Sequence, residues 1–258
     1  MGVELYNDGK HVCIAFYDLV DDEQSHTVQS NQFIIVDNGR GAIVDPGGNL
    51  TYNGLRMGMQ KFCFTDNVDL LLASHADPDI IASLNKWLIG SKAKVMISQI
   101  WSRFVPHFTN GRDLEDRIIG IPDAGAVIPL GNSNIKAIPA HFLHSEGNFQ
   151  FYDPVSKILF SGDMGASLVD NALAARPVED FKAHLPSMEG FHRRYMVSNK
   201  VCRLWVNMVR SMDVESIVPQ HGRAFKGRAM VNQFLDWIEK LECGVDIMTQ
   251  DNYRVPNS

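Results

Sequence analysis

The stretch VDLLLASHADPDI, residues 68–80, joins an apolar run to side chains that commonly bind metals. Its first six residues are mostly apolar, which is typical of a strand that is covered on both faces. His75, Asp77 and Asp79 follow at alternate positions, directly after this expected strand. Taken alone, Asp77 and Pro78 would predict only a helix N-cap with proline in the first turn. A site forms here only if other loops supply partners for these side chains.

Four further loops carry His or Asp just after an apolar run. They are Asp45-Pro46-Gly47-Gly48 after GAIV, His144-Ser145-Glu146-Gly147-Asn148 after IKAIPAHFL, Ser161-Gly162-Asp163 after KILF, and Pro219-Gln220-His221-Gly222 after SIV. Each loop alone is explained by a turn or by a structural histidine. Together, five strand ends that offer imidazole and carboxylate groups, without cysteine, favour one metal site with nitrogen and oxygen ligands.

Composition excludes several classes of protein. The chain has 258 residues, of which 45% are hydrophobic and 21% charged, so it can bury a sizeable core. The net charge is −6 and the basic residues are scattered, so we expect neither a nucleic-acid partner nor a membrane partner. No apolar stretch approaches the ~20 residues of a membrane span, and the N-terminus lacks a signal-peptide core. Cys13, Cys63, Cys202 and Cys243 lie far apart, as reduced thiols of a cytoplasmic protein would.

Strand-like runs alternate with helical runs along the chain. The expected strands are 11–17, 31–37, 41–45, 68–74, 93–98, 135–140, 148–153, 157–162 and 216–220, and the expected helices are 49–62, 78–90, 111–120, 191–212 and 227–242. This order predicts an α/β fold, a four-layer αββα sandwich of two mixed β-sheets with helices outside. We expect a single domain over 1–258, with two βα halves (about 1–130 and 131–245) and a short C-terminal tail.

The motif set as a whole resembles the metallo-β-lactamase fold. The matching residues are His75-x-Asp77-x-Asp79, His144, Asp163 and His221. The patterns of that fold are H-x-[HED]-x-D-H, then H-[ST]-x-G-[SN], then S-G-D, then a late G-H-G or S-H-G. The turn at residues 45–47 is also similar to the strand-end turn of the fold. The resemblance covers about residues 10–240, and it is specific because order and spacing agree together.

Two departures from the common pattern bear on the metal. Zinc hydrolases of this fold usually have histidines where this chain has Asp77 and Ile80. Isoleucine cannot bind a metal, and replacing an imidazole with a carboxylate makes the site harder and more anionic. This change favours iron or manganese over zinc. The pattern most resembles the flavodiiron group, in which the first motif is H-x-[ED]-x-D and the metals are two irons.

Two longer segments carry the same resemblance. Residues 140–165 are similar to the flavodiiron stretch around its second histidine and bridging aspartate. The segment FHRRYMVSNK (191–200) resembles the flavodiiron helix that brings a tyrosine near the irons. This implies that Tyr195 lies beside a bound ligand. Flavodiiron proteins add a flavodoxin domain with FMN, but this sequence has no such domain, P-loop or GxGxxG segment, so we expect no flavin in this chain. A stand-alone diiron domain also resembles the oxygen-binding diiron proteins of bacterial chemotaxis, which are sensors.

The resemblance implies a complete ligand set. The first metal would be held by His75, Asp77 and His144, the second by Asp79 and His221, with Asp163 bridging both. The second metal has fewer ligands and would be open to O₂ or NO. In the family pattern the ligand is the histidine before Ser or Thr, so we choose His144 and assign His141 to the surroundings or the core. Five histidines lie outside every motif and are expected to be structural: His11, His26, His107, His184 and His192.

Two functions from different classes remain open. The first is a non-haem diiron protein that binds O₂ or NO, either as an oxygen sensor or as the diiron module of a flavodiiron-like oxidoreductase. The alternative is a binuclear metal-dependent hydrolase, in which metal-bound hydroxide attacks an ester, phosphoester or amide. The expected cofactors are two iron ions, with zinc or manganese as alternatives. The expected partners are O₂ or NO, a signalling partner or separate electron donor, and a second copy of the chain in a homodimer.

Overall fold

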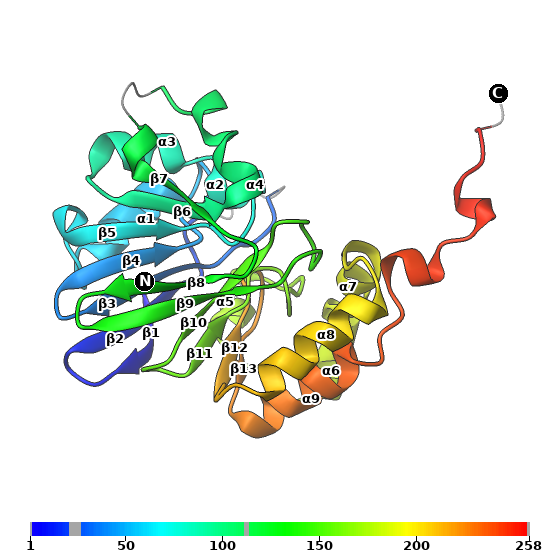
Figure 1. Cartoon of the computed structure of the whole chain (residues 1–258). Helices are drawn as coiled ribbons and strands as arrows, with labels where there is room; N and C mark the ends of the chain where they lie inside the picture. The colour runs from blue at the N-terminus through cyan, green and yellow to red at the C-terminus, as the bar shows by residue number, and fades with distance from the viewer. Residues whose placement is uncertain (1, 21–26, 111–113, 257–258) are drawn as a thin grey trace.

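The computed structural model describes residues 2–20, 27–110 and 114–256, and two β-sheets form its centre (Figure 1). The seven-stranded sheet has the order β1-β2-β3-β4-β5-β6-β7, and the six-stranded sheet has the order β13-β12-β11-β10-β9-β8. The strands are β1 Val3–Asn7, β2 His11–Phe16, β3 Gln32–Asp37, β4 Arg40–Val44, β5 Val68–Leu72, β6 Lys94–Ser98, β7 Ile118–Ile121, β8 Ala126–Leu130, β9 Ser133–Pro139, β10 Phe149–Asp153, β11 Ile158–Phe160, β12 Ser216–Val218 and β13 Phe225–Lys226. Both sheets mix parallel and antiparallel pairs.

Helices cover the outer faces of both sheets. The α-helices are α1 Tyr52–Met59, α2 Pro78–Ile81, α3 Leu84–Gly90, α4 Gln99–Ser102, α5 Asn171–Ala174, α6 Phe181–His184, α7 Glu189–Tyr195, α8 Asn199–Arg210 and α9 Arg228–Ile238. The short 3₁₀ helices are η2 Thr65–Asn67, η3 Val105–His107, η4 Glu115–Arg117, η5 Leu185–Ser187, η6 Gly244–Ile247 and η7 Gln250–Asn252. In Figure 1, α1 to α4 lie on the side of the first sheet, and α6 to α9 on the side of the second.

Three separate apolar clusters show the four layers. The cluster between the sheets contains Phe33 and Phe151, which come from different sheets. The cluster outside the first sheet joins Ile34 to Trp87 of α3, and the cluster outside the second joins Leu159 to Phe234 of α9. Each sheet is therefore buried on both faces, which explains the nearly continuous apolar runs of its central strands. The predicted αββα sandwich is confirmed.

Backbone hydrogen bonds draw the loops at one end of the sandwich together. Asp45 N, after β4, donates to Leu72 O at the end of β5 (2.8 Å), and Phe149 N of β10 donates to Ser74 O (2.8 Å), which links the two sheets. Gln220 N, after β12, donates to Gly162 O, after β11 (2.7 Å). The motif-bearing loops of both sheets are therefore fixed side by side at this end.

Several predicted elements differ in the structure. The helix predicted for 111–120 is wrong where it is described, since 115–117 form η4 and 118–121 form β7, which pairs with β6 in parallel. Residues 111–113 lie outside the described residues. The helix predicted for 191–212 is interrupted, because Met196 is extended and the carbonyl of Val197 accepts a bond from Val245 N (2.8 Å). Strands β1, β8 and β13 were not predicted, and β1 and β8 are outermost strands with mixed burial.

The described residues were also searched for membrane spans. None of the helices in these ranges combines the length and the apolar character that crossing a bilayer requires.

Candidate metal centre

His75 and Asp77 follow strand β5 and face each other. His75 is buried, and its Nδ1 lies 3.0 Å from Ser74 Oγ, which leaves Nε2 directed toward the carboxylates. Asp77 occupies the N-cap position of α2, but its side chain makes no capping hydrogen bond. Instead, Asp77 Oδ2 lies 3.5 Å from His75 Nε2. The simple explanation of Asp77 as a helix cap therefore fails, and its carboxylate is available to a metal.

Asp45 supports this loop from strand β4. Its Oδ1 accepts a hydrogen bond from Ser74 N at 2.9 Å, one residue before His75. Asp45 is fully buried and has a left-handed backbone conformation with φ of 52°. Burial raises the pKa of its carboxyl to about 6, although the bond from Ser74 acts in the opposite direction. The turn at residues 45–48 thus fixes the start of the His75 loop.

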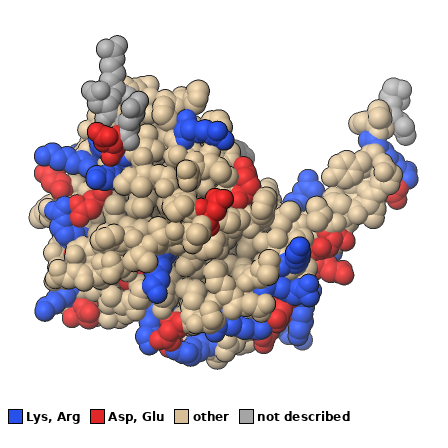
Figure 2. Space-filling model, viewed as in Figure 1, with Lys and Arg blue, Asp and Glu red and all other residues tan. Residues whose placement is uncertain are grey.

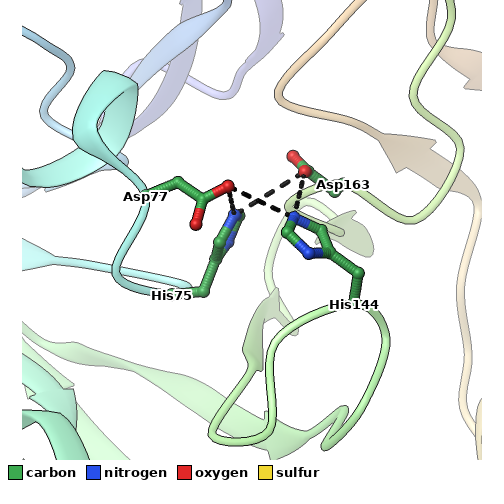
Figure 3. A group of neighbouring side chains, drawn as sticks. All are labelled: His75, Asp77, His144 and Asp163. Carbon is green, nitrogen blue, oxygen red and sulfur yellow. Dashed lines mark ion pairs between the residues drawn. The ribbon is translucent and has the colours of Figure 1, made fainter. Parts of the chain in front are cut away.

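His144 reaches the same point from the second sheet. Its loop follows β9 and is closed by a bond from Phe142 N to Ser145 O (2.7 Å) and by the Asn148 side-chain amide, which donates to Leu143 O. His144 Nε2 lies 2.8 Å from Asp163 Oδ2 and 3.4 Å from Asp77 Oδ2. Figure 3 shows His75, Asp77, His144 and Asp163 converging on one point.

Asp163 presents its two oxygens to different histidines. Oδ2 lies 3.6 Å from His75 Nε2 and 2.8 Å from His144 Nε2, whereas Oδ1 lies 3.5 Å from His221 Nε2. The preceding Ser161 fixes this loop, because its Oγ donates to Met164 O at 2.6 Å. A carboxylate in this position can bridge two ions, one for each oxygen.

Asp79 and His221 form the other side of the site. His221 Nε2 lies 3.2 Å from Asp79 Oδ2, and Gln220 Nε2 donates to the same oxygen at 3.2 Å. His221 Nδ1 donates to the carbonyl of Gln29 at 2.6 Å. The sequence motifs did not single out Gln29 or a role for the Gln220 side chain. Only the position of Gln220, next to His221, could have drawn attention to it.

The electrostatics of the site reflect a tight group of acids and imidazoles. Burial alone would raise the pKa of Asp163, but His75, His144 and His221 outweigh it and lower that pKa to about 2. The neighbouring imidazoles of His144 and His75 hold the pKa of Asp77 well below its usual value. Burial would lower the pKa of His144, yet Asp163 and Asp77 raise it to about 10. In the absence of a cation, protons on the imidazoles thus balance the carboxylates.

The residues present fit a metal pair. His75 Nε2 and Asp163 Oδ1 are buried, and among the described residues neither has a hydrogen-bond partner. One ligand atom from each of His75, Asp77, His144 and Asp163 lies within 4.8 Å of the others. Ligands ~2.1 Å from an ion and at right angles to each other lie ~3.0 Å apart, close to the separations in this group. The donors are nitrogen and oxygen alone, which suits iron, manganese or zinc.

A cavity of about 760 Å³ opens onto the site. Asp77, Asp79, His144, Asp163 and His221 line its floor, and Leu50, Leu168, Phe191 and Tyr195 are among the residues of its walls. The Tyr195 ring lies 5.3 Å from the His144 ring and stacks on Phe191 at 4.6 Å between centroids. Tyr195 is about half exposed. The structure therefore places Tyr195 at the wall of the cavity, beside His144.

The remaining histidines lie elsewhere or serve other contacts. His141 Nε2 donates to Asp123 O at 2.9 Å, its ring packs edge-on against Phe149, and it does not belong to the group of His75, Asp77, His144 and Asp163. His192 is buried, and its Nε2 accepts a bond from Gly165 N at 2.9 Å, two residues after Asp163. His184 bonds to Ser187, and His26 lies outside the described residues.

Ile80 does not face the cavity. It is fully buried in the apolar cluster outside the first sheet, together with Leu84 and Trp87. The cavity wall contains its neighbours Pro78 and Asp79 but not Ile80 itself. The side chain therefore contributes to packing between α2 and the sheet.

The fold and the clustered strand-end loops together define a protein of the metallo-β-lactamase fold. Within that class, the chain matches the family model described as "ODP family beta lactamase" over residues 28–222. This match covers most of the chain, and the chain therefore belongs to that family.

Solved structures of similar proteins include the chemotaxis sensor ODP in its peroxy diiron species. That structure is 42% identical and has a TM-score of 0.85, over 98% of this chain and 99% of that chain. The apo state of the sensor from T. denticola is 41% identical with a TM-score of 0.87, over 98% and 99% of the two chains. The rubredoxin oxygen:oxidoreductase of Desulfovibrio gigas is 14% identical with a TM-score of 0.76, over 93% of this chain and 61% of that one, and shows the fold alone.

One curated relative is an uncharacterized protein of Methanocaldococcus jannaschii. It is 23% identical over 211 residues, which are 80% of this chain and 52% of the relative. The chain thus spans about half the length of the curated relative that it matches.

Proposed function

We propose that this chain is a non-haem diiron protein that binds O₂ or NO and acts as an oxygen sensor. The observation that carries the proposal is Asp163, whose two oxygens face histidines on opposite sides of one buried site. The 42% identity over nearly the full length of a chemotaxis sensor with a diiron centre supports it. When bound at this site, a pair of irons would bind a diatomic molecule and exchange electrons with it.

The ligand roles belong to the same proposal. His75, Asp77 and His144 hold one metal, Asp79 and His221 hold the other, and Asp163 contacts both. The supporting geometry is that every imidazole–carboxylate pair on each side lies within 3.6 Å. Ser74 and Gln29 orient His75 and His221 through the ring nitrogens that face away from the metals. Gln220 donates to the Asp79 oxygen that faces His221 and so fixes that carboxylate.

The chemistry of the donors favours iron over zinc. Three of the six proposed ligands are carboxylates and none is a thiolate, so the site is hard and anionic. Zinc and manganese remain alternative occupants, because imidazole and carboxylate also suit these metals. The proposal therefore concerns the metal that the protein holds when iron is supplied during its synthesis.

Tyr195 has a proposed role beside the bound ligand. Its ring contacts the ring of His144 and lines the cavity that leads to the metals. Leu50, Leu168 and Phe191 line the cavity around it. Replacing Tyr195 with Phe should therefore leave metal content unchanged and alter the rate at which a bound diatomic ligand leaves.

A second candidate is a binuclear hydrolase. The observation that favours it is the cavity volume of about 760 Å³, which is far larger than a diatomic ligand needs. A small ester, phosphoester or amide would fit above metal-bound hydroxide. The same cavity also suits a third use, in which the chain is the diiron module of an oxidoreductase and receives electrons from a separate donor.

One experiment separates these functions. The protein is produced in iron-rich medium, purified without oxygen, analysed for metals, and mixed in its reduced form with O₂ and with NO. We expect two irons per chain and a strong change in the visible spectrum with either gas. Assays with generic ester, phosphodiester and β-lactam substrates should show only weak hydrolysis. Efficient hydrolysis, together with a ferrous form whose visible spectrum does not change with either gas, would refute the proposal and favour the hydrolase.

We also propose that the chain is one domain and forms a homodimer. The segment after α9 supports a homodimer, because it extends away from the body in Figure 1 and exposes Val245, Tyr253 and Val255. The capping boxes of η6 and η7 order this segment locally, although it projects into solvent. On the face in Figure 2, acidic and basic side chains are interspersed over the body and this segment. Sedimentation of wild-type protein and of a Val245→Asp, Tyr253→Asp double variant tests the dimer, since the variant should sediment as a monomer.

A further inference from the structure

A second group of buried metal-binding side chains lies at the far end of the sandwich from the metal centre. It consists of His11, Cys13, Asp37 and Asp153, here called the distal cluster. His11 begins β2, Asp37 ends β3, and Asp153 ends β10, whose first residue is bonded to the His75 loop. All four residues are almost fully buried, with exposures between 0% and 4%.

Three ligand atoms of the distal cluster lie at the separations of a tetrahedral metal site. Cys13 Sγ lies 3.8 Å from His11 Nε2 and 3.5 Å from Asp153 Oδ2, and these two atoms lie 2.9 Å apart. Typical bond lengths to zinc and tetrahedral angles would give ~3.6, ~3.6 and ~3.4 Å for these pairs. Only the distance between His11 Nε2 and Asp153 Oδ2 would have to increase, by ~0.5 Å. His11 and Cys13 share one face of β2 because they are two residues apart.

Asp37 holds the other side of the imidazole. His11 Nδ1 lies 2.9 Å from Asp37 Oδ1, and the backbone N–H of Asn132 donates to Asp37 Oδ2 at 2.6 Å. A carboxylate that accepts the Nδ1 proton leaves Nε2 free as a ligand and makes it more basic, which is the usual arrangement behind metal-bound histidine. Ser156 likewise bonds to Asp153 Oδ2 through its backbone N–H (3.1 Å) and fixes that carboxylate.

The charge of the distal cluster is compatible with a bound divalent cation. Two carboxylates are buried here, and a protonated His11 can balance only one of them. None of the described Lys and Arg side chains forms an ion pair with Asp37 or Asp153, whose only ionic partner within these ranges is His11. A divalent ion would take the place of two protons, that of the imidazolium and that of the Cys13 thiol, so it would bind without adding net charge to this buried group.

We infer that the distal cluster is a structural site for one borderline-soft divalent cation of the Zn²⁺ class. His11 Nε2, Cys13 Sγ and Asp153 Oδ2 are its ligands, and Asp37 positions His11. A tetrahedral ion would keep one position for water. The ion would join β2 of the first sheet to β10 of the second and so fasten the two sheets together. The site is independent of the proposed diiron centre and shares no residue with it.

Cobalt gives this site a signal that the proposed diiron centre cannot give. The protein is produced in cells supplied with Co²⁺, so that the metal is present while the chain folds. Only a thiolate ligand produces intense near-ultraviolet charge transfer to Co²⁺, and the proposed diiron ligands include no cysteine. We expect this absorption in wild-type protein, with one more equivalent of cobalt per chain than in Cys13→Ser. The Cys13→Ser variant should lose the absorption but keep the rest of its cobalt.

Cys202→Ser is the matched control. Cys202 is as buried as Cys13, and its Sγ lies 3.9 Å from that of Cys243, but no imidazole or carboxylate completes a metal group there within the described residues. This variant should keep both the absorption and the extra equivalent. Wild-type protein without the absorption, or absorption that persists in Cys13→Ser, would overturn the inference. The measurement on wild-type protein alone can refute the inference. Its outcome therefore does not depend on whether a variant folds.

Discussion

Asp163 is the residue on which both sides of the proposed diiron centre depend. It contributes one oxygen to the side of His75 and His144 and the other to the side of His221. Removing it would take a ligand from both ions and leave their mutual repulsion less screened.

We therefore predict that Asp163→Ala loses more metal than any other single ligand change. Removing a residue that only supports a ligand typically weakens metal binding by ~10–100-fold, and loss of the bridge should exceed that range. Metal content per chain after dialysis against a weak chelator measures the effect. His141→Ala is the control, because its side chain bonds to Asp123 O and should not affect metal content. Full metal occupancy in Asp163→Ala would contradict the bridging role of Asp163. Metal loss in His141→Ala but not in His144→Ala would make His141 the ligand in place of His144.

A second prediction concerns the metal-free protein and pH. The acids around His144 raise its pKa to about 10 from an ordinary value of 6.5. The folded state thus binds a proton more tightly than the unfolded state, so this stabilisation is complete below pH 6.5 and is lost toward pH 10. The free energy of unfolding from urea titrations should fall across this window. His144→Gln should reduce the slope; an unchanged slope would mean that His144 does not carry the proton.

The proposed ligands could be singled out from the sequence because each follows an apolar strand within a short motif. His75, Asp77 and Asp79 come from one loop, and the remaining ligands come from loops with their own local patterns. The distal cluster could not be found in this way. His11 and Asp153 are separated by 142 positions, and only the packing of β2 against β10 brings them together. No local pattern marks such a pair.

At the scale of elements, helix α2 connects the metal loop to the core. Its four residues begin directly after Asp77, and the buried Ile80 and Ile81 belong to the cluster outside the first sheet. The packing of α2 therefore fixes the start of the helix and, with it, the direction of Asp77 and Asp79. An isoleucine that looks like a missing ligand in the motif is a core residue in the structure.

The third prediction follows for Ile80. Ile80→Val should lower the free energy of unfolding by ~0.5–1.5 kcal/mol, as is typical of removing one buried methylene. Ile80→His should cost more, because it places a polar ring among Leu84 and Trp87 without a partner. Chemical denaturation measures both, and metal content should not rise in either variant. A stable Ile80→His protein with higher zinc affinity would instead show that position 80 reaches the metals.

Strands whose residues are buried were predicted more accurately from the sequence than strands with exposed residues. Strands such as β3 and β10 are buried at every position, so their apolar runs identified them. Strand β1 has intermediate and exposed residues throughout, so its sequence carries no comparable signal. Residues 118–121 of β7 resemble the continuation of a helix, but pairing with β6 makes them a strand. Helix propensity is a weak signal that such tertiary contacts override.

At the scale of the whole molecule, the two ends of the sandwich hold two different groups of side chains. One end gathers the proposed diiron ligands beneath an open cavity. The other end holds the distal cluster, with its side chains almost fully buried. Strands β2, β3 and β10 span the distance between the two, and their buried side chains pack in the central cluster. A rigid frame of this kind holds the ligand loops of both sheets in register.

The last prediction concerns electrons and the chain as a unit. Reducing O₂ to water takes four electrons, whereas two ferrous ions supply two. The chain covers about 61% of the rubredoxin oxygen:oxidoreductase structure that shares its fold. We therefore expect the reduced protein to take up O₂ in a single event, with a lasting change in its visible spectrum. An oxygen electrode should record little NADH-driven consumption until a reductase and an electron carrier are added. A sensor needs only to bind O₂ and transmit the resulting conformational change to a partner. Sustained O₂ consumption by the chain and NADH alone would therefore contradict a sensor and show a self-sufficient oxidoreductase.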